Sequence, residues 1–157
     1  MIEGRYFADN LLMHNAKTTL NMIRAALIFA IAAYMFIGEK LATGKAGPAN
    51  TMLFQILAII AVLNVVVILI IRRNMVRPSL AGLASNAGDG VALNRWRVGY
   101  VITYALCEAV ALYGFILRIM GFSFRSVAPF YLASIILMIF FAPRTVEGQS
   151  SSAAVAQ

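Results

Sequence analysis

Charged residues are scarce in this sequence. They make up 12% of its 157 residues, whereas soluble domains carry about 25%. Hydrophobic residues make up 62%, and the mean hydropathy is +0.85. Because a soluble domain of this length needs a charged surface, the composition argues against a soluble fold. It favours a chain whose long apolar segments have lipid as their solvent.

Cysteine and histidine are nearly absent, since each occurs once, as Cys107 and His14. A lone cysteine forms no disulfide within the chain and no cysteine-based metal cage. The single histidine precedes the first apolar segment, which excludes bis-histidine haem ligation within a bilayer by this chain alone. The motifs GxxxxGKS/T, HExxH, GxSxG and CxxC are also missing. We therefore expect no catalytic residue, no metal and no cofactor, and we interpret the protein as non-enzymatic.

Acidic residues are outnumbered by basic ones, six to 13, and the net charge is +7. Such a charge is also found in nucleic-acid-binding domains. Here the basic residues flank apolar segments, where they hold a membrane protein in one orientation. We expect a lipid bilayer as the surrounding medium and no nucleic-acid partner.

Four apolar segments approach the roughly 20 residues that a helix needs to cross the hydrocarbon core. They are residues 20–37, 51–71, 96–117 and the short 126–142. The two short connections contain glycine, so consecutive spans are expected to run antiparallel. We predict an all-α integral membrane fold of four transmembrane helices, arranged as two tandem antiparallel hairpins over 20–71 and 96–143.

The remaining segments are predicted to lie outside the bilayer. Residues 1–19 form an N-terminal segment, and 72–95, with Pro78 and three glycines, are predicted to be a linker. The Ser/Ala-rich tail 144–157 is predicted to be disordered. Nine of the 13 Lys and Arg residues lie on the side of the termini and the linker, and four lie on the other side. This bias predicts cytoplasmic termini and a cytoplasmic linker.

Three arginines follow the second span, at positions 72, 73 and 77. Their simplest role is to stop transfer of the chain across the membrane. A basic cluster at this position also favours contact with anionic lipid headgroups, at about 1 kcal/mol per charge. We therefore predict headgroup contact for Arg72, Arg73 and Arg77.

Glu108 is the one acidic residue within the predicted spans. Arg97 and Arg118 bracket it, 21 positions apart, a distance of about 31 Å at helical rise. Glu108 therefore lies near the bilayer midplane, where a charge costs at least about 2.5 kcal/mol. Its side chain should face protein.

Residues at matching depth supply partners for this carboxyl. Tyr104 lies one helical turn before Glu108 and shares its face of the helix. Counting from the ends of the other spans places one polar residue of each near the same depth. The predicted midplane cluster consists of Glu108, Tyr104, Asn64, Tyr34 and Ser134.

Two roles for Glu108 stay open. As a structural group it would form a hydrogen bond between helices, which contributes about 0.6 kcal/mol on average. As a functional group it would bind and release a proton or cation, a common role of carboxyl groups within membranes. A contact with a partner subunit or a ligand is the third alternative.

The segment from Glu108 to Gly114 resembles the ion-binding region of V-type ATPase proteolipid subunits, which has the pattern Glu-Ala-x-x-Leu-Tyr-Gly. That resemblance implies that Glu108 is an ion-carrying carboxyl. The proteolipid glutamate lies in the second helix of its hairpin, whereas Glu108 lies in the first predicted helix of the second hairpin.

A wider resemblance covers most of the second half of the chain. Ala105, Leu106, Glu108 and Ala109, followed by the short span that ends at 140–144, resemble small uncharacterised bacterial four-span proteins. This resemblance implies a bacterial-type inner membrane. Taken together, the sequence favours an accessory subunit or an oligomeric component of a membrane complex, with a membrane-protein partner or a second copy of the chain. The alternative is a proton- or cation-translocating protein that uses Glu108.

Overall fold

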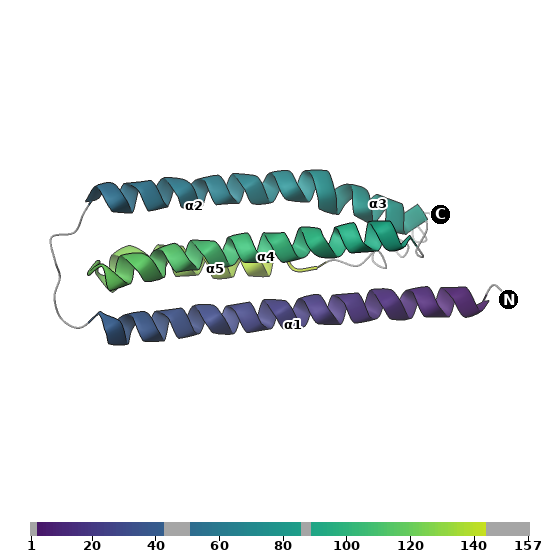
Figure 1. Ribbon diagram of the computed structural model, residues 1–157, viewed down its shortest axis with the longest axis horizontal. Helices are drawn as coiled ribbons and strands as arrows, with labels where there is room; N and C mark the ends of the chain where they lie inside the picture. Colours follow the sequence, from purple (N-terminus) through teal and green to yellow (C-terminus); the bar gives the residue numbers. More distant parts are fainter. Residues whose placement is uncertain (1–2, 43–50, 86–88, 144–157) are drawn as a thin grey trace, which may run out of the picture.

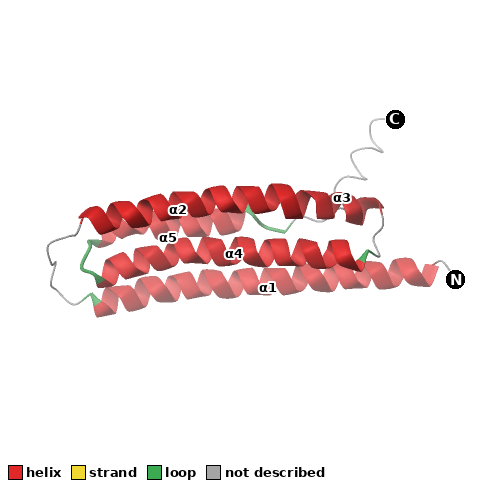
Figure 2. Cartoon of the chain, turned by 45° about the horizontal axis from the view of Figure 1, so that its top comes forward, coloured by secondary structure: helices red, strands yellow, loops and turns green. Residues whose placement is uncertain are grey.

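The computed structural model describes residues 3–42, 51–85 and 89–143, and for residues 3–13 and 84 it describes the backbone alone. All regular structure in these residues is helical (Figures 1 and 2). The elements are α1 (Glu3–Leu41), α2 (Thr51–Ile71), the π-helical turn η1 (Arg72–Val76), α3 (Arg77–Ser85), α4 (Gly90–Ile119) and α5 (Phe124–Phe140).

Three stretches of helix in the described residues are long and apolar enough to cross a membrane. They are His14–Leu41, Thr51–Leu83 and Gly90–Ile119. The fourth helix, α5, is apolar but has only 17 residues. The all-helical class and the four apolar helices agree with the sequence prediction, and α2 has the predicted bounds. The helices α1 and α4 are longer than the predicted spans, because polar residues extend each of them beyond its apolar part.

The long helix α4 occupies the centre of the bundle. It packs against α1, α2, α3 and α5, whereas α1 and α2 lie on opposite sides of it (Figure 1). The consecutive helices α1 and α2 run antiparallel, as predicted from the short connection between them. They are held together chiefly through α4 and not by a shared interface of their own.

The segment 72–95, predicted from sequence as a linker, is largely helical. The chain continues from α2 through η1 into α3, and α4 begins at Gly90. Pro78 directly follows the π-helical turn η1, where the backbone hydrogen bonds already depart from the α-helical pattern, since the Arg77 amide donates to the carbonyl of Arg72. Leu83 is buried and packs with Trp96, so apolar contacts with α4 hold this helix in place.

The turn between α4 and α5 is fixed by backbone hydrogen bonds. Gly121 has φ 93°, a left-handed conformation that glycine adopts without a steric penalty. Its amide donates to the carbonyl of Arg118, and the amide of Phe122 donates to the carbonyl of Leu117. This is the Schellman arrangement, and it ends α4 sharply so that α5 folds back along it. The predicted disordered tail 144–157 lies outside the described residues.

Candidate functional site

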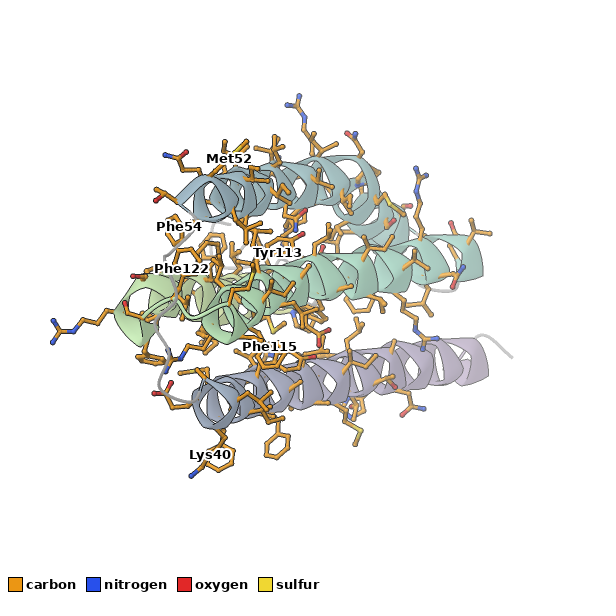
Figure 3. All side chains as sticks on the ribbon, turned by 60° about the vertical axis from the view of Figure 1, so that its left-hand side comes forward. Lys40, Met52, Phe54, Tyr113, Phe115 and Phe122 are labelled. Carbon is orange, nitrogen blue, oxygen red and sulfur yellow. The ribbon has the colours of Figure 1, made fainter. Side chains whose placement is uncertain are left out.

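Glu108 forms a hydrogen bond with Tyr34 across the contact between α1 and α4. The Tyr34 hydroxyl donates to Oε1 of Glu108 at 2.8 Å, and both side chains are partly buried. The Tyr34 ring packs against Phe115, with 5.6 Å between ring centroids, and Phe115 points from α4 toward α1 in Figure 3. The structure therefore brings together two of the five residues of the predicted midplane cluster.

Asn64 lies on a different side of α4. Its side-chain amide donates to the hydroxyl of Tyr113 at 3.1 Å, which joins α2 to α4. Ser134 lies on a third side, where its hydroxyl donates to the carbonyl oxygen of Cys107 at 2.6 Å and joins α5 to α4. Four residues of the predicted cluster thus take part in three separate hydrogen bonds to α4, one each from α1, α2 and α5.

Tyr104 is fully buried, and its hydroxyl has no hydrogen-bond partner among the described residues. It lies in a ladder of aromatic rings on one face of α4. Trp96 and Tyr100 have ring centroids 5.1 Å apart, and Tyr100 and Tyr104 have centroids 6.0 Å apart. Tyr104 therefore belongs to this ladder and not to the Tyr34–Glu108 pair.

The three arginines that follow α2 have different surroundings. Arg73 and Arg77 are exposed, and their contact with headgroups stays a prediction. Arg72 is partly buried, and its guanidinium carbon lies 4.4 Å from the centroid of Phe141 and 5.4 Å from that of Tyr100. Cation–π contacts with two rings hold this charge against the bundle.

An ion pair at the opposite end of the bundle is absent from the sequence prediction. Arg118 of α4 contacts Glu39 of α1 through two nitrogens, each 2.9 Å from the same carboxylate oxygen. A third nitrogen of Arg118 donates to the carbonyl of Phe122 at 2.9 Å. The sequence analysis ended the first span at residue 37. The sequence did contain a signal for this ion pair, because Glu39 and Arg118 have opposite charges and lie at similar depths in their helices.

An apolar groove of about 210 Å³ lies where α2, α4 and α5 meet. Small side chains of α2 and α5, Ala58, Ala61 and Ala133, form part of its wall. Nearer the connecting turns, Phe54 contacts Phe122, with ring centroids 5.8 Å apart (Figure 3).

The chemistry that the Glu108 site offers in the described residues is hydrogen bonding. A carboxyl group that accepts one hydroxyl hydrogen has oxygen lone pairs left for further donors. In the part of the chain that the structure describes, no three His, Cys, Asp or Glu side chains gather as metal ligands. No protein-family model, no curated protein and no solved structure matches this chain.

Proposed function

We propose that this protein is a non-enzymatic integral membrane protein that serves as an accessory subunit or an oligomeric component of a membrane complex. It crosses a bacterial-type inner membrane with four helices and keeps both termini in the cytoplasm. The observation that carries the proposal is the partly buried carboxyl of Glu108 in the middle of α4, which accepts one hydrogen bond from the described residues of its own chain.

The outer faces of the bundle suit a lipid or protein environment. Large apolar side chains are exposed on α1 and α2, among them Phe29 at 77% and Met52 at 69%. In water, an apolar surface that covers whole helices causes association. In a bilayer it is the ordinary outer surface of a membrane protein, and the 9-to-4 distribution of basic residues orients it.

A comparison of energies indicates that Glu108, when it is ionised, requires a second contact. An ionised carboxyl at the bilayer centre costs at least about 2.5 kcal/mol. One hydrogen bond between helices contributes about 0.6 kcal/mol on average and about 1.7 kcal/mol at most. The Tyr34 hydroxyl alone therefore does not compensate for an ionised Glu108. A polar group of a partner helix at the α1–α4 contact would supply the remainder.

Paired substitutions at Glu108 test this proposal. Glu108→Gln keeps a side chain that exchanges hydrogen bonds, whereas Glu108→Leu keeps only its approximate size. The native mass of the full chain, extracted in a mild detergent, should exceed the monomer mass. We expect Glu108→Gln to retain this assembly and Glu108→Leu to lose most of it, while both keep their helical circular dichroism.

The control substitution is Glu39→Gln, which removes a carboxyl at the far end of the bundle. It should leave the native mass unchanged. A parent chain that is monomeric, or an assembly that Glu108→Leu leaves intact, would refute the proposal.

The second candidate function is the translocation of a proton or cation by Glu108. The observation that favours it is the incomplete burial of the Tyr34–Glu108 pair, because an ion carrier needs access to its carboxyl. A hydrophobic carbodiimide should then modify Glu108, and Na⁺ or a higher pH should slow the reaction. Peptide mass spectrometry locates the adduct, with Asp89 and Glu39 as internal reference carboxyls. A chain that stays unlabelled at Glu108 under all conditions would exclude this function.

A further inference from the structure

One face of the central helix α4 is left uncovered by the other helices of the described residues. In Figure 1 α1 and α2 lie on opposite sides of α4, and α5 lies behind it, so that α4 turns this face toward the viewer. Every side chain along the face is exposed or partly exposed. We call it the open face, and it consists of Val98, Ile102, Ala105, Ala109, Leu112, Ile116 and Ile119.

The open face has the spacing of a coiled-coil seam. Its residues are all apolar and follow one another at alternating intervals of four and three positions, which is the a and d pattern by which two helices pack side by side. The b, c and f positions of the same heptads are buried within the chain's own bundle. From the first b position after Ile102 to the last before Arg118, they are Thr103, Tyr104, Cys107, Val110, Ala111, Gly114 and Leu117.

An apolar face also suits lipid, so the polar groups at its two edges decide what covers it. Glu108 lies at the edge beside α1, where Oε1 accepts from the Tyr34 hydroxyl. Tyr113 lies at the edge beside α2, where its oxygen accepts from the Asn64 amide. Among the described residues, Oε2 of Glu108 has no donor and the hydroxyl hydrogen of Tyr113 has no acceptor. One edge therefore has an unfilled acceptor, and the other edge has an unfilled donor.

We propose that the open face binds the same face of a second copy of the chain, so that two α4 helices pair in parallel. The inference rests on the proposed function, because copies inserted into a membrane in one orientation have parallel α4 helices. In the heptad, Glu108 is a g position and Tyr113 is the e position that follows it, and g and e side chains meet across a parallel pair.

Two-fold symmetry doubles this contact, since each surface patch meets its own copy. Tyr113 of each copy then donates a hydrogen bond to Glu108 of the other, which fills the donor and the acceptor together. The Tyr113 hydroxyl is thus the polar group of a partner helix that an ionised Glu108 requires.

Cysteine cross-linking tests the pairing. Ala105 lies on the open face, whereas Ala32 is exposed on α1, two positions before Tyr34 and therefore close to the same depth. The full chain with Ala105→Cys or Ala32→Cys is oxidised by copper phenanthroline in membranes isolated from the expressing cells. Ala105→Cys should give a disulfide-linked pair of twice the chain mass, in a yield several-fold above that of Ala32→Cys. The parent chain is the blank, because Cys107 is 0% exposed.

Further variants test the hydrogen bond between the copies. Tyr113→Phe removes the donor and should weaken the pairing several-fold, as measured by energy transfer between labelled copies while lipid dilutes the chain. Asn64→Leu removes the other hydrogen bond of Tyr113 but keeps its hydroxyl, and it should change the pairing less than twofold. In a Glu108→Leu background, where the acceptor is absent, Tyr113→Phe should no longer change the pairing that remains.

The outcomes separate this inference from the proposed function. A native mass above that of the monomer, with no cross-linked pair from Ala105→Cys or Ala109→Cys, would show that another face forms the assembly. It would overturn the inference and leave the proposed function standing, as would a cross-link from Ala105→Cys to a different protein. Equal yields from Ala105→Cys and Ala32→Cys would come from random collision and would also overturn the inference. A monomeric parent chain would overturn both.

Discussion

At the scale of single residues, the Tyr34 hydroxyl is the one group of the described chain that donates to Glu108. Tyr34→Phe removes this donor and leaves the ring against Phe115. We expect the free energy of unfolding to fall by about 0.6 kcal/mol, the average for hydrogen bonds between membrane helices. Titration with sodium dodecyl sulfate, followed by circular dichroism, measures it.

The control is the same substitution in a Glu108→Leu background, where no acceptor remains. There Tyr34→Phe should have no effect, so the double-mutant cycle yields the energy of the pair. A cycle that closes with zero coupling would show that the hydrogen bond contributes nothing.

Gly114 makes a second prediction at this scale, because it lets α5 approach α4 closely. A Cβ atom at Gly114 would lie 3.0 Å from Cβ of Phe130 and 3.4 Å from the carbonyl oxygen of Val127. These atoms belong to or adjoin the backbone of α5, so the helices must separate. We expect Gly114→Ala to destabilise the fold by about 1–3 kcal/mol, the usual range for overpacking.

Gly90 supplies the matched control, since a Cβ atom there would meet nothing within 4 Å. Thermal unfolding of the two alanine variants in one detergent compares them. Gly90→Ala should match or exceed the parent chain in stability. Equal thermal midpoints for Gly114→Ala and Gly90→Ala would contradict the close approach.

Counting residues along each helix predicts how deep a side chain lies in the bundle, but it does not predict which neighbouring helix the side chain faces. Depth placed Tyr34 opposite Glu108, where the structure has a hydrogen bond. It also placed Asn64 and Ser134 at that level, but they contact other sides of α4. The depth of a residue follows from its position in the sequence and the fixed rise of an α-helix. The side of α4 that the residue contacts depends on how the neighbouring helices pack.

At the scale of elements, Asp89 caps the N-terminus of α4, the helix on which the others pack. Its carboxylate accepts hydrogen bonds from the amides of Val91 and Ala92, at 2.9 and 3.1 Å. Asp89→Ala leaves these amides without a partner and should cost about 0.5–2 kcal/mol of stability. Amide hydrogen exchange in the first turn of α4 should accelerate.

The conservative variant separates the cap from the charge. Asp89→Asn keeps an oxygen that accepts both hydrogen bonds, and asparagine is about as good an N-cap as aspartate. Its stability and exchange should stay close to those of the parent chain. If Asn and Ala variants lose equal stability, the charge and not the cap is responsible.

The extent of each element could be predicted only where composition changes abruptly. The bounds of α2 follow from an apolar run that only Gln55 and Asn64 interrupt and that ends at Ile71, directly before Arg72. The helices η1 and α3 were not predicted, because Pro78 and glycine are typical of linkers. Burial of Leu83 against α4 outweighs that local tendency. Such a contact joins residues of different elements and leaves no pattern in the local sequence.

At the scale of the whole molecule, the other α-helices of the described residues, α1, α2, α3 and α5, all pack on α4. Two antiparallel pairs were expected from the connections, yet α4 separates α1 from α2 (Figure 1). The composition of α4 explains its position. Its buried residues include the small Gly99, Cys107, Ala111 and Gly114 and several aromatic side chains. By contrast, Ile68 is the one residue of α2 that is buried. The short connections between consecutive helices predict that these helices run antiparallel. The distribution of small residues decides which helix is central.

The orientation of the whole molecule in a membrane is the last prediction. Nine basic residues on one side predict that Arg73 faces the cytoplasm and Lys40 the opposite side. Both side chains are exposed, so Arg73→Cys and Lys40→Cys place reactive thiols at the two ends of the bundle. A membrane-impermeant maleimide added to intact spheroplasts should label Lys40→Cys at once and Arg73→Cys only after lysis. The parent chain is the blank, because Cys107 is 0% exposed and should react in neither case. The reverse pattern would invert the topology, and labelling of both variants in intact cells would contradict a membrane-spanning bundle with its termini in the cytoplasm.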